Sequence, residues 1–363
     1  MIIVPHTLSI ITTHKCTAAC DHCCFNCSPQ VPHQMTAARI HGYIDQATEI
    51  PSIQAIVFTG GECFLLGKEL DALVRRSSNH GFGTRFVSNG YWATSREIAR
   101  KRLSRLVDNG LLEANFSTGD AHSRYVPPEY VRNGAIEAAA AGLTTVIMVE
   151  LFEKSQFDFE AFVDDAEFKK FLDKGQIIIN NSPWMSFKGE TSLTYTEKHL
   201  DFHKDQKACT TALKVLAITP TEKLIACCGL PLEEIPELCL GDLTKKSIKE
   251  IIQSQNDDFI KIWIHVEGPD AVIDYARQFD STIPKQHEKA HVCDKCRAMY
   301  HDKRVIEIVK KSPPKHMDRI INKYLQSLMF IKTEAAIECD VEFYKASCSL
   351  KSAREIRKLA LTA

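Results

Sequence analysis

Residues 16 to 23 read Cys16-Thr17-Ala18-Ala19-Cys20-Asp21-His22-Cys23, which places three cysteines at spacings x3 and x2 just behind an apolar strand. Three thiolates this close together can hold three irons of a [4Fe–4S] cluster and leave the fourth iron open to a small molecule. Zinc is the alternative, but a structural zinc site closes its tetrahedron with four ligands from paired knuckles. The spacing therefore favours an iron–sulfur cluster.

At these residues the sequence resembles the radical S-adenosylmethionine (SAM) enzymes, whose hallmark is this triad. The resemblance implies that the open iron is chelated by the amino and carboxylate groups of SAM. It also implies reductive cleavage of SAM to methionine and a 5′-deoxyadenosyl radical. His22 stands just before the last cysteine, where the family usually has an aromatic ring beside the adenine.

A second triad overlaps the first. Cys20, Cys24 and Cys27 also read C-x3-C-x2-C, so two registers compete for one cluster. We predict Cys16, Cys20 and Cys23 as the ligands, because this register follows the strand-like run 8–12 after only a few residues. The second register also offers Asn26 at the position that the first fills with His22.

The overall composition is that of an ordinary globular protein. The chain has 363 residues, of which 44% are hydrophobic and 25% charged, with a net charge of −1; its length suits roughly two domains. The charge gives no general attraction to nucleic acid or membrane, and neither a membrane-spanning run nor a signal peptide is visible. Fourteen cysteines then suggest metal sites in a reducing, cytoplasmic compartment.

Strand-like runs alternate with amphipathic helices through the first half of the chain. Expected strands are 7–12, 53–59, 84–88, 112–117, 144–151 and 176–180. Expected helices are 37–48, 68–79, 95–109, 129–141 and 158–174. The strands are near-continuous apolar runs, typical of parallel strands buried on both faces. We predict an α/β fold, a partial (β/α)6 radical SAM barrel over residues 1–184, with its chemistry at the carboxyl ends of the strands.

Gly60, Gly61 and Glu62 follow the second expected strand. Glycines let a backbone approach a ligand closely, and in the radical SAM family this element holds the amino group of SAM. The family commonly has proline at the next position, whereas this chain has Cys63. Cys63 is either a packed small hydrophobe or a thiol that faces the substrate.

Polar residues also end the third and fourth expected strands. By position, Ser88, Asn89, Ser117 and Asp120 resemble the residues that the family places around the ribose and carboxylate of SAM. The alternative for each is a loop cap or an Asx-turn. His122 and Arg124 are candidates for acid/base catalysis and for a carboxylate clamp, or are ordinary loop residues.

A second cysteine block follows a polar linker at residues 185–205. Cys209, Cys227, Cys293 and Cys296 supply four thiolates, enough to close one further [4Fe–4S] cluster. Residues 216–229 read as a β-hairpin with a turn at 220–222. Zinc is the competing interpretation, because C-x2-C knuckles also suit zinc.

The block over residues 206–300 resembles the small α+β twitch domain, a shortened relative of the SPASM domain that follows the barrel in many radical SAM enzymes. One departure is Glu222, which stands near the place of the usual turn glycine. Cys228 or Cys239 could replace an assigned ligand, and only Cys339 and Cys348 remain further on, at unsuitable spacing. We therefore predict one auxiliary cluster and two [4Fe–4S] clusters in total.

Residues 301–363 form a predicted helical C-terminal extension, with 13 Lys and Arg against 8 Asp and Glu. Its basic face could dock an acidic leader peptide or protein partner, or could simply be solvated. Ile320, Ile321, Tyr324, Leu325 and Leu328 recur at helical spacing.

The resemblance implies a radical SAM enzyme that abstracts a hydrogen atom from its substrate and uses an auxiliary cluster in oxidation or bond formation. We expect a flavodoxin- or ferredoxin-like reductant and a ribosomal peptide as substrate. The alternatives are a dehydrogenase or epimerase of small-molecule natural-product intermediates, and a non-catalytic metal-binding scaffold. The chain starts directly at the first strand, without room for an N-terminal peptide-binding domain, which favours the small-molecule alternative.

Overall fold

The computed structural model describes residues 3–187, 193–197, 200, 208–255, 258–286 and 288–331. The predicted linker at 185–205 is therefore described only in part. The predicted extension is described as far as residue 331, and Cys339 and Cys348 lie outside the described residues.

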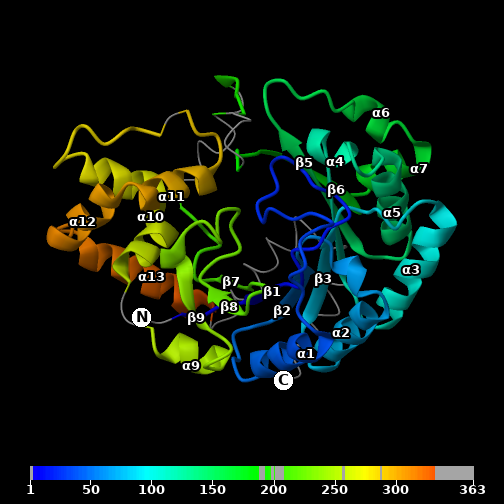
Figure 1. Cartoon of the computed structure of the whole chain (residues 1–363), viewed down its shortest axis with the longest axis horizontal. Helices are drawn as coiled ribbons and strands as arrows, with labels where there is room; N and C mark the ends of the chain where they lie inside the picture. Colours follow the sequence, from blue (N-terminus) through cyan, green and yellow to red (C-terminus); the bar gives the residue numbers. More distant parts are fainter. Residues whose placement is uncertain are drawn as a thin grey trace.

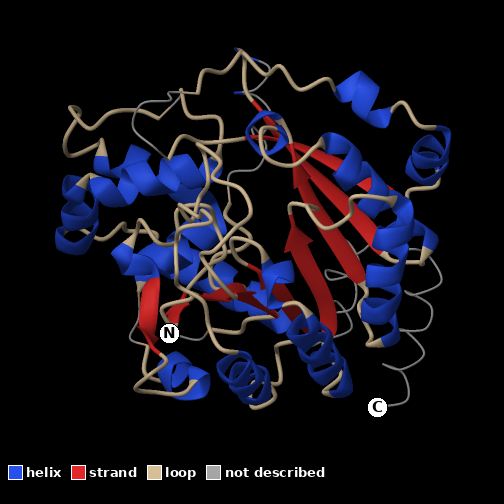
Figure 2. Cartoon of the chain, turned by 45° about the vertical axis from the view of Figure 1, so that its right-hand side comes forward, coloured by secondary structure: helices blue, strands red, loops and turns tan. Residues whose placement is uncertain are grey.

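One curved sheet of nine strands, in the order β6-β5-β4-β3-β2-β1-β7-β8-β9, runs through the molecule. Its first six strands are parallel and comprise β1 (Thr7–Ile11), β2 (Ala55–Thr59), β3 (Gly83–Ser88), β4 (Glu113–Thr118), β5 (Thr144–Leu151) and β6 (Ile177–Pro183). The sheet curves but does not close (Figure 2), because β6 and β9 remain at its two edges. The predicted α/β fold with a partial barrel is thus confirmed.

Helices cover the outer face of the six parallel strands (Figure 1). They are α1 (Ala37–Ala47), α2 (Lys68–Asn79), α3 (Arg96–Asp108), α5 (Pro128–Ala140), α6 (Phe159–Val163) and α7 (Ala166–Asp173), with the short η1 (Cys63–Leu66) and α4 (Asp120–Ser123). Phe58, Phe86 and Phe116 are fully buried in the core cluster. Successive side chains of a strand alternate between faces. The strand residues directly before and after each phenylalanine therefore face the inside of the curved sheet.

The prediction of a single helix over residues 158–174 is wrong. The structure has two helices, α6 and α7, separated at Asp164 and Asp165. Asp165 has extended backbone geometry and its carboxylate accepts hydrogen bonds from the backbone N–H groups of Glu167 and Phe168. An aspartate that caps in this way starts a new helix, and Asp158 caps α6 similarly.

The second cysteine block begins with the expected hairpin. Strands β7 (Val215–Ile218) and β8 (Lys223–Ile225) are antiparallel, and β9 (Cys239–Asp242) follows the short η2 (Pro236–Leu238) and pairs with β8. Strand β7 also pairs in parallel with β1, with Thr7 opposite Val215. The hairpin therefore continues the sheet of the barrel.

Five helices complete the described chain: α9 (Ile248–Gln253), α10 (Phe259–Ala276), α11 (Val292–His301), α12 (Lys303–Lys311) and α13 (Met317–Ile331). Helix α10 is kinked at Gly268, which has a φ of 84° and precedes Pro269. Ile320, Tyr324 and Leu328 of α13 are buried as expected, whereas Leu325 is exposed. Arg319 and Lys323 pair with Glu267 of α10, so these two cations are engaged within the molecule.

Within the described part of the chain, no helix combines the length and the apolar character needed to cross a membrane.

Candidate active site

The loop between β1 and α1 carries the first three predicted ligands. Cys16 and Cys20 are each 8% exposed, and together with Cys23 they pack in one small cluster. Cys27, which is 2% exposed, belongs to the same cluster, and its backbone N–H lies 3.3 Å from the Cys23 Sγ. The structure therefore brings together the residues of the first register, with Cys27 as a further thiol beside them.

The surroundings of these thiols act on their ionisation in opposite directions. Burial raises the pKa of Cys16 to about 11 and that of Cys20 to about 12. A hydrogen bond with the Cys27 thiol lowers the pKa of Cys23 to about 6. Metal ligation requires thiolates, so binding of iron at Cys16 and Cys20 has to displace protons.

Gly60 and Gly61 hold the cysteine loop against the end of β2. The Gly61 N–H donates to the Thr13 carbonyl at 2.6 Å, and the Glu62 N–H donates to the Lys15 carbonyl at 3.0 Å. A Cβ on Gly61 would lie 2.3 Å from the Lys15 carbonyl oxygen, and one on Gly60 would lie 2.6 Å from that of Thr13. Both glycines are thus required by the close approach of the cysteine loop itself.

The Glu62 carboxylate is completely buried. It accepts hydrogen bonds from the backbone N–H groups of Phe64 (3.0 Å) and Asn89 (2.9 Å) and from the Ser88 hydroxyl (3.0 Å). Burial raises its pKa to about 7. An ionised carboxylate has about four acceptor positions, so these three donors leave capacity for one more.

Ser88 and Asn89 connect β3 to both parts of this site. The Ser88 hydroxyl contacts Glu62, and the Asn89 side-chain amide lies 3.5 Å from Cys16 Sγ and 3.0 Å from the Thr17 hydroxyl. Two of the predicted polar residues therefore lie beside the cysteine cluster and Glu62.

Three contacts from other strand ends fasten the cysteine loop. Arg124 forms an ion pair with Asp21, and the Tyr125 hydroxyl donates to the Ala19 carbonyl at 2.9 Å. At the end of β6, the Trp184 indole N–H donates to the His22 carbonyl at 2.9 Å. Arg124, a predicted carboxylate clamp, thus binds a carboxylate of this chain.

His22 is 7% exposed, and its ring meets that of Phe152 edge-on at 5.9 Å. Its Nε2 is buried and has no hydrogen-bond partner among the described residues. Burial lowers its pKa. A buried polar atom without a partner is uncommon, so this ring offers a free hydrogen-bonding position inside the site.

His122 lies opposite a carboxylate that sequence reasoning did not identify. Its Nδ1 is 3.4 Å from Glu150 Oε2, and Glu150 is 3% exposed in β5. Although burial opposes it, the Glu150 carboxylate raises the pKa of His122. Glu150 also accepts a hydrogen bond from Ala121 N–H, and a Cβ on Gly119 would lie 2.3 Å from its carboxylate.

The remaining predicted residues divide between the inner face, the loops and the core. Ser117 lies in β4 between the outward-facing Phe116 and the buried Thr118. Asp120 binds the loop after β5, where it accepts from the Ser155 hydroxyl and from the Gln156 N–H at 2.6 Å. The Cys63 thiol is fully buried in the main hydrophobic core and faces the Val87 carbonyl at 3.4 Å, which is a packed position.

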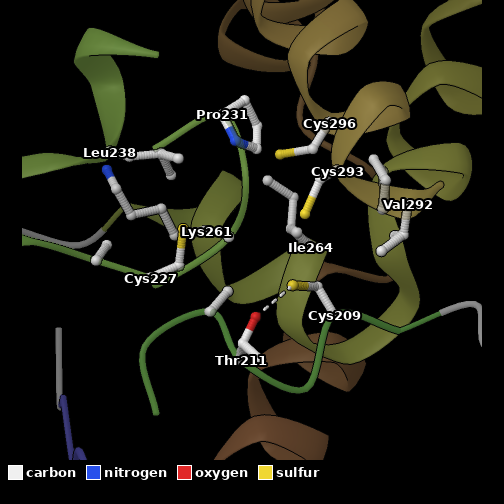
Figure 3. A pocket seen from close by; sticks show the side chains of 14 residues that line it. Cys209, Thr211, Cys227, Pro231, Leu238, Lys261, Ile264, Val292, Cys293 and Cys296 are labelled. Atoms are coloured by element: carbon white, nitrogen blue, oxygen red, sulfur yellow. Dashed lines mark hydrogen bonds between the residues drawn. The ribbon is translucent and has the colours of Figure 1, made fainter. Parts of the chain in front are cut away.

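The four predicted auxiliary ligands line one cavity that is partly open to solvent. Figure 3 shows the cavity with Cys209, Cys227, Cys293 and Cys296 around it. Neither Cys228 nor Cys239 is among its lining residues in the described chain. The rest of the wall is largely apolar, and burial raises the pKa of Cys227, Cys293 and Cys296.

Gly229 provides the space between two of these thiols. A Cβ at this position would lie 3.1 Å from the Cys293 Sγ and 3.6 Å from the Cys227 Sγ. In the described ranges, no group of three or more His, Cys, Asp or Glu side chains is arranged to hold a single metal ion. Four thiols around one apolar cavity suit a [4Fe–4S] cluster. Three thiols in one loop beside Glu62 suit a [4Fe–4S] cluster whose fourth iron is open to a small molecule.

Comparison with known proteins agrees with this geometry. Residues 10–119 match the family model described as the radical SAM superfamily. The chain is 29% identical over 127 residues to a Bacillus subtilis (strain 168) protein named "Putative peptide biosynthesis protein YydG". That match spans 35% of this chain and 40% of the relative's own length.

Two solved structures are also similar. One, described as native anSMEcpe with bound AdoMet and Cp18Cys peptide, has a TM-score of 0.50 and 14% identity, covering 85% of this chain and 99% of that one. The other, BtrN in complex with AdoMet and 2-DOIA, has a TM-score of 0.44 and 14% identity over 80% of this chain and 99% of that one. The family match covers the cysteine loop and the Gly-Gly-Glu element, so residues 10–119 have the sequence of a radical SAM domain.

Proposed function

We propose that this chain is a radical SAM enzyme with two [4Fe–4S] clusters that modifies a ribosomal peptide. The observation that carries the proposal is the presence of two separate cysteine sets. Three cysteines pack together in the loop after β1, and four others line one cavity. The first set leaves one iron open, and the second supplies a full complement of ligands.

In the first site, Cys16, Cys20 and Cys23 would hold the cluster. When bound, such a cluster supplies the electron that cleaves SAM, and the radical produced removes a hydrogen atom from the substrate. Glu62 has acceptor capacity left for the amino group of SAM, and His22 offers an unpartnered ring nitrogen in the same site. Ser88 contacts Glu62 and Asn89 contacts Cys16, so these two residues fix the position of Glu62 relative to the cysteine loop.

The roles of four other residues follow from their contacts. Arg124 and Asp120 bind groups of this chain, so we propose that they order the loops around the site. His122 is supported by Glu150 and is therefore a candidate for contact with SAM or substrate. Cys63 is assigned a packing role, because it is buried in the core.

In the second site, Cys209, Cys227, Cys293 and Cys296 would hold the auxiliary cluster. Four protein ligands leave no iron open for a substrate, which supports a role in electron transfer. An oxidised cluster of this kind can take one electron from the substrate radical after hydrogen abstraction, and a flavodoxin- or ferredoxin-like protein would exchange electrons with the enzyme. The protein positions and shields this chemistry, which belongs to the cofactors.

A peptide substrate is supported by the similarity to YydG, whose printed name refers to peptide biosynthesis. The basic face of α13 does not add support, because Arg319 and Lys323 pair with Glu267. The substrate assignment therefore depends on this relative.

The first experiment measures iron, sulfide and zinc per chain after anaerobic reconstitution, with 5′-deoxyadenosine assayed under dithionite. We expect about eight irons and release of the nucleoside. About four irons with one zinc would retain the radical chemistry but remove the auxiliary electron acceptor. Absence of nucleoside release would exclude a radical SAM activity and favour a metal-binding scaffold.

Paired cysteine variants assign the ligands. Cys23→Ala should lose about four irons and all SAM cleavage, whereas Cys24→Ala should keep both, because Cys24 belongs only to the second register. The reverse result would assign the cluster to Cys20, Cys24 and Cys27. Cys296→Ala should lose the other four irons and keep nucleoside release, with Cys228→Ala as its matched control.

A separate experiment tests the peptide. Candidate precursor peptides encoded beside this chain are incubated with the reconstituted enzyme and SAM, and mass spectrometry follows loss of two hydrogens or formation of a crosslink. Turnover of a small-molecule alcohol, with no change in any peptide, would contradict the peptide assignment while leaving the radical chemistry intact.

A further inference from the structure

The wall of the auxiliary cavity contains one cation. Within the described ranges, Lys261 is the only Lys or Arg among the residues that line it (Figure 3). Lys261 is 6% exposed, although a lysine is rarely buried to this extent. Its ammonium group forms an ion pair with Asp258 one turn earlier in α10, and the Asp258 side chain is 35% exposed.

Burial of that ammonium group needs a reason, because removal of a charge from water is costly unless a counter-charge compensates it. Asp258 supplies part of the compensation from the solvent side. On the other side are four thiols and apolar groups such as Leu238 and Ile264. A cluster held by four thiolates carries net negative charge, which a nearby lysine would balance.

A second feature lies on α11. Tyr300 is 2% exposed, and its hydroxyl is buried without a hydrogen-bond partner among the described residues. Tyr300 follows Cys296 by four residues on the helix, and residues at this spacing share a face. Cys293, at seven residues before Tyr300, lies on that face as well.

A buried hydroxyl without a hydrogen-bond partner is destabilising, so each such group in a native structure needs an explanation. Burial raises the pKa of Tyr300 well above its usual value. The hydroxyl therefore remains protonated at neutral pH and is available as a donor. Sulfur atoms of a bound cluster are acceptors for such a donor.

We propose that Lys261 and Tyr300 set the reduction potential of the auxiliary cluster, Lys261 as a buried counter-charge and Tyr300 as a hydrogen-bond donor to sulfur. This inference rests on the auxiliary cluster of the proposed function. Positive charge and hydrogen bonds to sulfur both stabilise the reduced state, because reduction adds one electron and increases the negative charge. Together they make the cluster a better acceptor for an electron from the substrate radical.

Other charged groups on α11 are arranged differently. Asp294 is 8% exposed and is held by Lys289 (3.2 Å) and Arg297 (2.8 Å), and Lys295 pairs with Asp270 at 2.7 Å. These groups do not line the cavity, whereas Lys261 does. Tyr300 lies on the face of α11 that carries Cys293 and Cys296, so Lys261 and Tyr300 are the groups whose removal should change the cluster most directly.

The test is a redox titration of both clusters, followed by electron paramagnetic resonance, in the full-length reconstituted chain. Lys261→Met and Tyr300→Phe should each keep about eight irons and should each shift the auxiliary midpoint potential to a more negative value. Lys261→Arg should restore the wild-type potential, because it retains the charge. The first cluster, in the loop after β1, should keep its potential in all three variants and serves as an internal reference.

Matched controls are Lys310→Met and Tyr130→Phe, whose parent residues lie on α12 and α5, away from the cavity. An unchanged auxiliary potential in Lys261→Met and Tyr300→Phe, with about eight irons present, would overturn the inference. If Lys261→Met loses iron, the auxiliary potential of Tyr300→Phe decides whether the inference holds, because this variant removes only a hydroxyl group. A wild-type protein with only about four irons would instead refute the auxiliary cluster itself, so the two failures are distinguishable.

Discussion

Gly60 and Gly61 illustrate how one residue type can serve two requirements. The sequence pattern assigned both glycines to a cofactor, since a Gly-Gly-Glu element after the second strand is typical of the family. In the structure, they are needed because the backbone at Thr13 and Lys15 passes within hydrogen-bonding distance of them. The motif therefore positions the cysteine loop as well as any ligand.

We predict that Gly61→Ala destabilises this contact. The new Cβ would lie 2.3 Å from the Lys15 carbonyl oxygen, which is backbone and cannot move aside cheaply. We expect a loss of about 3 kcal/mol in the free energy of unfolding and loss of the irons of the first cluster, measured by urea unfolding and iron analysis. Wild-type iron content in this variant would contradict the inference that Gly61 positions the cysteine loop.

Gly42→Ala is the matched control. Gly42 lies inside α1, where nothing is found within 4 Å of a new Cβ. Alanine is favoured over glycine in a helix by about 0.5–1 kcal/mol, so this variant should unfold at slightly higher urea and keep its iron.

Glu150 shows what the sequence pattern could not reveal. Cys16, Cys20 and Cys23 are found from local spacing, and Glu62 from two adjacent glycines. Glu150 is the seventh residue of an apolar strand and has no local signature. Its role depends on Gly119 and His122, which the parallel pairing of β4 with β5 brings beside it.

At the level of elements, the β7–β8 turn depends on one strained residue. Glu222 has a φ of 60°, the left-handed region in which glycine is usual. Its carboxylate accepts hydrogen bonds from Arg39 and Tyr43 of α1. These contacts offset the strain and attach the hairpin to the barrel, which explains how glutamate is accommodated in a conformation that favours glycine.

Two substitutions separate the strain from the contacts. Glu222→Ala loses the contacts and keeps the left-handed backbone, whereas Glu222→Gly loses the contacts but relieves the strain. We expect both to be destabilised, and the glycine variant by about 1 kcal/mol less than the alanine variant. Urea unfolding at one pH measures the difference, and an alanine variant as stable as the glycine variant would refute the strain.

Helix α10 is attached through a buried histidine. His265 is 6% exposed, its Nδ1 lies 2.8 Å from the Ala212 carbonyl, and burial lowers its pKa to about 4. The folded protein thus favours the neutral ring, and stability that is present above pH 6.5 is lost as the pH falls toward 4. The protein is therefore expected to become less stable as the pH falls.

We predict that between pH 7.5 and 5.5 the wild-type protein loses about 1 kcal/mol more unfolding free energy than His265→Asn. Asparagine keeps a donor for the Ala212 carbonyl but does not titrate. His301→Asn, at an exposed position, should retain the wild-type pH dependence. Equal pH dependence in the wild type and in His265→Asn would contradict the assignment.

Helix boundaries were predictable where capping residues agreed with the apolar pattern, as at Ser95 before α3. The exception is the pair α6 and α7. Apolar residues occur on both sides of the break, Phe162 and Val163 before it and Phe168 after it, so the apolar pattern does not mark the boundary. Only the hydrogen bonds of Asp165 reveal the boundary.

At the scale of the whole molecule, barrel and auxiliary region share one sheet. The sequence predicted the parallel strands and the hairpin correctly, because each is a local pattern. The parallel pairing of β1 with β7 joins Thr7 to Val215, and no local pattern could indicate such a distant partner. The His14 Nε2 also lies within hydrogen-bonding distance of Glu233 Oε1, at 2.9 Å, which adds to the connection between the two regions.

We predict that residues 1–205 do not form a stable protein alone. Without β7, strand β1 would present an unpaired edge that includes Leu8 and Ile10, both fully buried in the complete chain. Exposed edges of this kind promote aggregation. Size-exclusion chromatography and circular dichroism should show an aggregated or unfolded fragment, and a monomeric fragment with cooperative unfolding would contradict the prediction.

The β1–β7 pairing also bears on how the chain folds during synthesis. Strand β1 is made roughly two hundred residues before β7, its second neighbour in the sheet. Contacts between such distant segments form slowly, and the incomplete sheet stays exposed for the interval. We therefore expect slow refolding from denaturant and a higher soluble yield on chaperone co-expression, the latter because a bound chaperone would shield β1 until its partner strand has been made.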